Sequence, residues 1–241
     1  MVEREDVLAI IVADGTTSSL YAAEAAEFIT GMIDHFALRP STALIDHARD
    51  GLLELRKAAA ARPITISASV PEAIREHVLA AALDKVRSSH QSTLMAVRAE
   101  CHPYAMLLSP VQCGDSALLV YGRDGRLFYS TTPLRRSQTE QGKPPRLSFV
   151  RSGSLTAVLP EQADVTMVWE AAIAVEPTSV IVVTSDGLVD AFDGPEDLWA
   201  WIRGPGVDPI VDVAGDIHAR LQARRGDDDV SFVIAWRTDV E

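Results

Sequence analysis

Three short apolar segments carry aspartates at one end, and this pattern constrains the fold more than any other feature of the sequence. The segments are residues 10–15, 182–187 and 227–234, and their aspartates are Asp14, Asp186 and the run Asp227, Asp228 and Asp229. Short β-branched runs of this kind predict buried strands. The aspartate follows the first two strands and precedes the third. If the third strand is antiparallel to the others, all three carboxylate groups lie at one edge.

Carboxylates gathered at one edge repel one another unless a proton or a cation compensates their charge. Oxygen ligands favour hard cations such as Mg²⁺ or Mn²⁺. Gly15 would let the backbone approach closely and offer a carbonyl oxygen as a further ligand. Asp-Gly is also a common turn dipeptide, so each pair taken alone favours a structural turn. Asp124-Gly125, with a strand predicted on each side, is interpreted as a hairpin turn only.

Hydrophobic periodicity predicts helices in the first third of the chain and mainly strands afterwards. Helices are expected over residues 20–36, with Ser18 and Ser19 as candidate caps, and over 41–61, 71–86, 195–202 and 208–223. Strands are expected over residues 7–13, 93–99, 104–113, 117–121, 126–130, 165–175, 179–184 and 230–236, with a polar loop at 137–146. Because short turns join consecutive strands, one domain with mostly antiparallel pairing is the simplest interpretation.

The composition excludes several classes of protein. The chain has 241 residues and a formal net charge of −12, which argues against nucleic acid, since a phosphate backbone requires a basic surface. Its two cysteines predict neither a disulfide framework nor a paired zinc motif. The longest apolar runs are far shorter than the roughly 20 residues that span a bilayer. We therefore expect a reduced, cytoplasmic protein that binds no membrane.

Several motifs follow one another along most of the chain. They are Val12-Ala13-Asp14-Gly15, Gln91-Ser92-Thr93-Leu94, Gln112-Cys113-Gly114-Asp115-Ser116, the segment 121–127, Thr184-Ser185-Asp186-Gly187 and Asp228-Asp229-Val230-Ser231. In this order and spacing they resemble the motifs of the metal-dependent (PPM, or type 2C) serine/threonine protein phosphatases. The resemblance implies an α+β fold, a four-layer sandwich of two mainly antiparallel sheets flanked by helices. It also implies that residues 1–241 form a single domain of this type, with a shortened N-terminus.

The resemblance further implies a metal-dependent phosphoprotein phosphatase that uses two Mn²⁺ or Mg²⁺ ions, with a third, looser ion. Asp14 would bridge two ions, and Gly15 would offer its carbonyl. Asp186 and Asp228 would complete one site, and Asp115 would hold the further ion together with Asp186. Through a metal-activated water, Asp14, Asp186 and Asp228 would serve hydrolysis of phosphoserine and phosphothreonine. The implied partners are phosphorylated proteins, with a serine/threonine kinase or its substrates among them.

The sequence departs from the family pattern at two places. Family members carry a strand before the first acidic strand, with an arginine that grips the phosphate and an acidic metal ligand. Only six residues precede Val7 here, which predicts no room for that strand and its turn. Ala117 stands where an arginine follows the Gly-Asp-Ser motif. These departures keep open a weakly active or inactive phosphatase-like module that binds or regulates a partner. A metal-independent enzyme, with its Asp-Gly pairs as turns, is the third alternative.

Overall fold

The computed structural model of the chain describes residues 2–4, 6–16, 19–38, 41–131, 134–136, 147–149, 167–168, 172–203, 219–220, 222–223 and 229–237. Its first sheet has the strand order β1, β2, β3, β4, β10, with β9 also paired to β4, and every described pair is antiparallel. The strands are β1 (Val2–Arg4), β2 (Val7–Val12), β3 (Leu94–Cys101), β4 (Met106–Cys113), β9 (Met167–Val168) and β10 (Ile173–Val175).

The second sheet has the antiparallel order β12, β11, β5, β6. Its strands are β5 (Ala117–Tyr121), β6 (Leu127–Ser130), β11 (Val180–Thr184) and β12 (Phe232–Ala235). A separate hairpin pairs β7 (Leu134–Arg136) with β8 (Leu147–Phe149). The antiparallel pairing of β11 with β12 confirms the arrangement on which the convergence of the strand-end aspartates depends.

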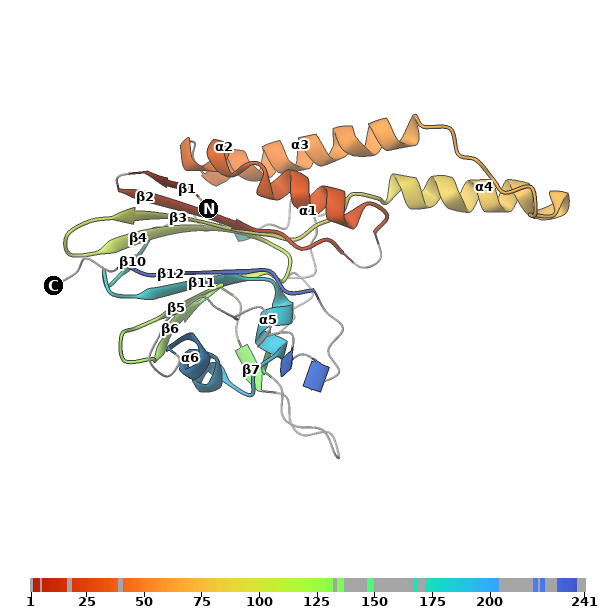
Figure 1. Cartoon of the computed structure of the whole chain (residues 1–241). Helices are drawn as coiled ribbons and strands as arrows, with labels where there is room; N and C mark the ends of the chain where they lie inside the picture. Colours follow the sequence, from red (N-terminus) through yellow and green to blue (C-terminus); the bar gives the residue numbers. More distant parts are fainter. Residues whose placement is uncertain are drawn as a thin grey trace.

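Helices cover the outer face of each sheet, and the four layers are visible in Figure 1. On the first sheet lie α1 (Ala22–Thr30), α2 (Ile33–Leu38) and α3 (Ser41–Ala60), and the next helix is α4 (Glu72–Arg87). On the second lie α5 (Asp186–Asp190) and α6 (Pro195–Arg203). The structure thereby confirms the α+β four-layer sandwich of two mainly antiparallel sheets.

Alternating side chains of the central strands enter two different apolar layers. Ala9 and Ile11 of β2 pack against the helices, whereas Ile10 and Val12 face the second sheet. Both faces of β2 are therefore buried, which explains why its sequence is continuously apolar and does not alternate with polar residues. The layer between the sheets also contains Ile181 of β11 and similar residues of β3 and β5.

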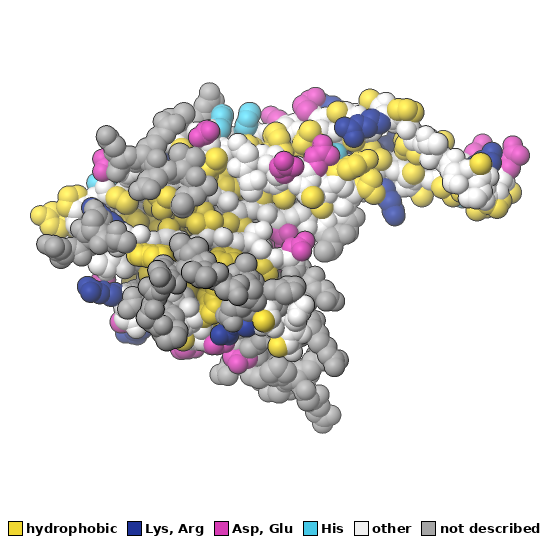
Figure 2. Space-filling view, viewed as in Figure 1, with side chains coloured by type: hydrophobic (Ala, Val, Ile, Leu, Met, Phe, Trp, Pro, Cys, Tyr) yellow, Lys and Arg dark blue, Asp and Glu magenta, His cyan; other side chains and the backbone are white. Residues whose placement is uncertain are grey.

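Helix α4 projects away from the sandwich, as Figure 1 shows. It exposes Ile74, Val78 and Leu79, and hydrophobic side chains are visible among charged ones along the projecting arm in Figure 2. Within the described residues, no helix is both long and apolar enough to cross a membrane.

Two expectations about individual elements were wrong. The helix expected over residues 20–36 is two helices, α1 and α2, separated at Gly31, where glycine's low helix propensity favours a break. The first six residues do contain a strand: β1 pairs with the start of β2. The adjacent strands β10 and β11, joined by a turn at residues 176–179, belong to different sheets. The helix expected at 208–223 and the loop at 137–146 lie largely or wholly outside the described residues.

The hairpin interpretation of Asp124-Gly125 is confirmed. The N–H of Gly122 donates to the carbonyl of Arg126 at 3.0 Å, and Asp124 Oδ1 accepts from the N–H of Arg126 at 3.1 Å. Gly125 has a φ of 84°, and a Cβ there would collide with the Trp199 ring of α6. Only glycine meets both demands, so this turn fixes the end of the second sheet against α6.

Candidate functional site

Strand ends from both sheets meet at one edge of the sandwich. In the first sheet, Val12 of β2 pairs with Met95, and Leu94 pairs with Cys113 at the end of β4. In the second, Thr184 at the end of β11 pairs with both Ala117 and Phe232, the first residues of β5 and β12. The connection 114–116 crosses from one sheet to the other. We call this the aspartate edge, because Asp14, Asp115 and Asp186 each lie two residues past the end of a strand, which is β2, β4 and β11 respectively.

The backbone of Asp14 is held on both sides by the residues that precede β3. Its N–H donates to Thr93 Oγ1 at 3.2 Å. Its carbonyl accepts from the N–H of Thr93 and from Ser92 Oγ, each at 2.8 Å. Ser92 and Thr93 are buried, so these bonds fix the direction in which the chain leaves β2.

Gly15 is required here by close packing. A Cβ at this position would lie 2.6 Å from the carbonyl carbon and oxygen of Ala22, at the start of α1. The residue also forms an isolated antiparallel bridge with Ser92. The glycine therefore lets α1 pack directly against the turn that follows Asp14. The close approach at Gly15 is therefore that of α1, and the carbonyl of Gly15 as a metal ligand stays a prediction.

The loop that carries Asp115 is tied to the same point. Ser116 Oγ and Thr93 Oγ1 share a hydrogen bond of 2.7 Å, and both side chains are buried. Gln112 Nε2 donates to the carbonyls of Gly114 and Ser116, at 3.2 and 2.9 Å. The Thr93 hydroxyl thus joins the backbone of Asp14 to the residue next to Asp115.

Asp186 is the first residue of α5 and is 9% exposed. The residue before it is bound to the segment that leads into β12: the N–H of Ser185 donates to the carbonyl of Ser231 at 2.9 Å. The N–H of Ser231 donates in return to Ser185 Oγ at 3.1 Å. A Cβ on Gly187 would lie 2.5 Å from the carbonyl oxygen of Asp229. The start of β12 is therefore packed on the turn that carries Asp186.

Asp228, the remaining predicted ligand, lies outside the described residues, and its neighbour Asp229 is exposed. Among the residues that the structure describes, no three His, Cys, Asp or Glu side chains form a group that could hold a metal ion. The fold brings Asp14, Asp115 and Asp186 to one edge, and their assignment as ligands stays a prediction.

The two charged residues of β1 pair with β2 far from this edge. In the β1–β2 pair, Arg4 is opposite Val7 and Glu3 is opposite Leu8. Asp14 follows Val7 by seven residues, which at about 3.3 Å per residue places Arg4 roughly 23 Å away along the strand. Strand β1 exists, contrary to the sequence-based expectation. Its register nevertheless places Arg4 at the far end of β2 from Asp14.

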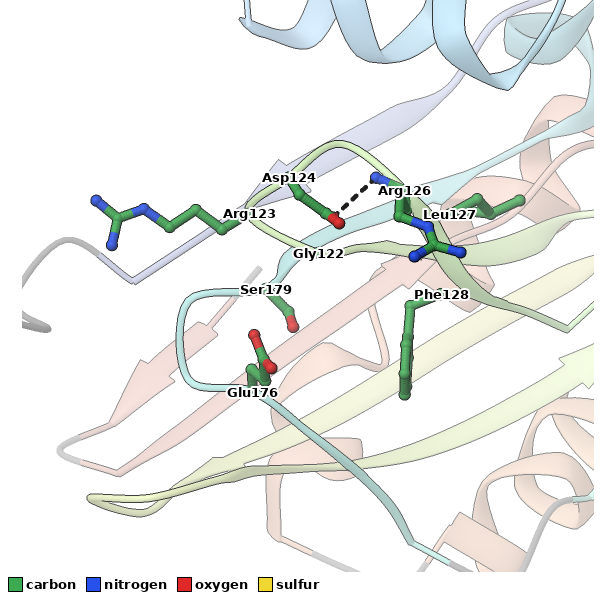
Figure 3. Close-up of a pocket in the computed structure, with 8 residues that line it drawn as sticks. All are labelled: Gly122, Arg123, Asp124, Arg126, Leu127, Phe128, Glu176 and Ser179. Carbon is green, nitrogen blue, oxygen red and sulfur yellow. Dashed lines mark hydrogen bonds between the residues drawn. The ribbon is translucent and has the colours of Figure 1, made fainter.

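A pocket of about 660 Å³ opens at the opposite end of the second sheet. Figure 3 shows its lining, which comes from the β5–β6 hairpin and from the turn before β11. The carboxylate of Glu176 lies beside Ser179, and Arg123 extends away from both. Because β5 and β11 span the whole sheet between this pocket and Asp186, the pocket is separate from the aspartate edge.

Sequence reasoning missed the buried polar side chains that support the edge. His90 is 1% exposed, and its ring stacks on that of Tyr21 at 5.0 Å between centroids. Burial lowers the pKa of His90, against the opposing effect of the nearby Glu24 carboxylate. Gln91-Ser92-Thr93 was recognised as a family motif at the entrance of a strand, without the hydrogen bonds that it makes to Asp14 and Ser116. A run of hydroxyl and amide residues before an apolar strand is a weak signal of this network.

Comparison with known proteins agrees with the fold and the motifs. The model of the family described as "Protein phosphatase 2C" matches residues 1–205. The chain therefore belongs to the protein phosphatase 2C family, and it has the fold of serine/threonine phosphatases of this class. A search of curated proteins finds no significant match to the sequence.

Solved structures share this fold at low sequence identity. One is PppA, a key regulatory component of T6SS in Pseudomonas aeruginosa, with 20% identity and a TM-score of 0.52, covering 94% of this chain and 85% of that one. Another is the serine/threonine phosphatase of S. agalactiae, with 16% identity and a TM-score of 0.51, covering 95% and 87%.

Proposed function

We propose that the chain is a Mn²⁺- or Mg²⁺-dependent phosphatase acting on phosphoserine and phosphothreonine in proteins. One observation carries the proposal: in a member of the phosphatase 2C family, the strand registers bring Asp14, Asp115 and Asp186 to one edge from two different sheets. The proposed substrates are phosphorylated proteins, and a serine/threonine kinase would supply them.

The residues present have the chemistry that such ions require. Asp14, Asp115, Asp186 and Asp228 offer carboxylate oxygens, and Gly15 offers a carbonyl, which together form an all-oxygen donor set of the kind that Mg²⁺ and Mn²⁺ prefer. When bound, a pair of such ions neutralises the phosphate and lowers the pKa of a water molecule toward neutrality.

The contribution of the chain is to hold the acidic side chains in place. Ser92 and Thr93 fix the backbone of Asp14 from both sides. Ser185 and Ser231 fix the turn that carries Asp186. Polar groups that are already oriented need no rearrangement during a reaction, which is the main way in which a rigid site lowers a barrier.

The test is turnover of p-nitrophenyl phosphate and of a phosphothreonine peptide by the purified chain, with and without MnCl₂. We expect Mn²⁺-dependent hydrolysis that Asp14→Asn and Asp186→Asn each reduce by about a hundredfold, because each variant would lose one of the carboxylates proposed to hold the ions. Asp124→Asn is the matched control, because Asp124 lies in the hairpin at the other end of the second sheet. Full activity in both edge variants would contradict the assignment.

A phosphatase-like module that binds without turnover is the second candidate, and the register of β1 favours it. With Arg4 opposite Val7, and Ala117 at the start of β5, neither position supplies an arginine to the aspartate edge. A phosphate without a bidentate arginine is held less firmly. This candidate predicts no hydrolysis and weak Mn²⁺ binding by calorimetry, while a phosphopeptide still binds.

A further inference from the structure

Two residues beside the aspartate edge have an unusual backbone conformation. Tyr21 has a φ of 63° and His90 a φ of 57°, and in the described part of the chain no other non-glycine residue has a positive φ. Bulky side chains adopt this conformation only where the surrounding structure enforces it. Such outliers cluster at functional sites, and here the residues that follow them, Ala22 and Gln91, contact Gly15 and Thr16 in the turn after Asp14.

The two residues hold each other in place. Their rings stack at 5.0 Å with an interplanar angle of 29°, and the N–H of His90 donates to the carbonyl of Leu20 at 2.9 Å. The His90 ring is buried: its Nδ1 lies 2.8 Å from Ser89 Oγ, and its Nε2 lies 3.5 Å from Glu24 Oε2. Tyr21 therefore rests on an anchored, buried ring and has little freedom to move.

Helix stability does not explain the tyrosine. Tyr21 occupies the N-cap position of α1, and its side chain makes no capping hydrogen bond. Asn, Asp, Ser or Gly would cap the helix better, and Asn or Gly would also adopt the positive φ at lower cost. Tyrosine at position 21 is thus unfavourable both as a helix N-cap and at a positive φ.

The position of Tyr21 beside the aspartate edge suggests a role for its ring. The residue after it, Ala22, packs directly on Gly15, next to Asp14. The residue after His90, Gln91, accepts a hydrogen bond at its carbonyl from the N–H of Thr16 at 3.2 Å. Despite these contacts, Leu20 is 39% exposed and Tyr21 is 38% exposed. An apolar pair, with the Tyr21 ring stacked on buried His90, therefore borders the aspartate edge and faces solvent.

We propose that Leu20 and Tyr21 form a docking surface for the polypeptide next to the phosphorylated residue, and that they select an apolar side chain there. The inference rests on the proposed function, because it places the phosphate of the substrate at the aspartate edge. A substrate polypeptide that brings its phosphate to the aspartate edge must pass the residues that border this edge. A preorganised aromatic ring offers contact area at a small cost in conformational entropy. The Glu24 carboxylate beside His90 disfavours an acidic residue at the same place.

The experiment compares two phosphothreonine peptides that differ only in a leucine or a serine two residues from the phosphothreonine. We expect the intact chain to prefer the leucine peptide by about tenfold in kcat/KM, a typical effect of burying part of one apolar side chain. Tyr21→Asn removes the ring and tolerates the positive φ, so it should lose this preference. Tyr21→Phe keeps the ring and should retain it. Tyr104→Asn is the matched control, since Tyr104 is 92% exposed in the distant β3–β4 turn.

The outcomes test the docking surface and the proposed function independently of each other. Hydrolysis of p-nitrophenyl phosphate with no leucine preference, or with a preference that survives in Tyr21→Asn, overturns the docking surface and leaves the phosphatase standing. If nothing is hydrolysed, the phosphatase is wrong, and the same peptides are compared by fluorescence anisotropy. Equal affinities in that assay overturn the docking surface as well, whereas tighter binding of the leucine peptide that Tyr21→Asn abolishes supports it.

Discussion

The hydroxyl of Thr93 joins the turn that carries Asp14 to the connection that carries Asp115. Removing this hydroxyl tests its role directly. Thr93→Val keeps the shape of the side chain and deletes the oxygen. The variant loses the bond from the N–H of Asp14 at 3.2 Å and the bond shared with Ser116 Oγ at 2.7 Å. Both partners lie in the interior or at its margin, where water replaces lost bonds poorly.

The magnitude follows from these two bonds. The bond shared with Ser116 contributes about 1 kcal/mol net, and loss of the acceptor for the N–H of Asp14 costs roughly 1–3 kcal/mol, so Thr93→Val should lower the free energy of unfolding by about 2–4 kcal/mol. For a chain of this size that corresponds to a fall in Tm of roughly 5–15 °C. Thr93→Ser keeps the oxygen and loses one methyl group, which costs about 1 kcal/mol.

The assay is urea unfolding followed by circular dichroism, with Thr30→Val as the matched control. Thr30 is exposed, and its hydroxyl bonds only within its own helix, so that variant should change stability by less than about 0.5 kcal/mol. A double-mutant cycle of Thr93→Val with Ser116→Ala should show a coupling of about 1 kcal/mol. Strict additivity, or a loss no larger than that of Thr30→Val, would refute the role assigned to Thr93.

Three further predictions concern packing, pH and thiol reactivity. Gly15→Ala should cost about 1–3 kcal/mol in urea unfolding, because its Cβ would lie 2.6 Å from the backbone of α1. Gly31→Ala, whose closest contact would be 3.3 Å, should be nearly neutral, and equal effects of the two would contradict the packing argument. Burial lowers the pKa of His90 below its ordinary 6.5, so the unfolded chain binds its proton first and stability should fall as pH drops below about 6.5. His90→Asn should flatten the Tm profile between pH 7.5 and 5.5, and an unchanged profile would exclude His90 as the cause. Burial raises the pKa of the Cys113 thiol to about 12, so at pH 8 Ellman's reagent should label the half-buried Cys101 first and Cys113 only on unfolding. Rapid labelling of both thiols in the native protein would show that Cys113 is accessible.

The spacing of apolar residues along the sequence predicted most of the helices and strands. This works because the buried face of each element repeats with the period of that element. The continuous apolar run of β2 predicted a strand buried on both faces, which its alternating contacts with α1 and the second sheet explain. The break at Gly31 was missed, since a helical periodicity continues through it while the backbone does not. The strand β1 was missed because the six residues before Val7 were judged too few for a strand and its turn, whereas a strand of three residues is enough to pair with β2.

The sequence by itself determined the family, the antiparallel character of the sheets and the strand-end positions of Asp14, Asp115 and Asp186. Tertiary structure alone decided what holds them. Thr93 bonds to Asp14 across 79 positions, and no local pattern of residues reports a contact at that separation. The positive φ of Tyr21 likewise depends on a ring that arrives from the far end of α4. Periodicity records which face of an element is buried, whereas the partner of a single hydroxyl or ring is fixed only when distant segments pack together.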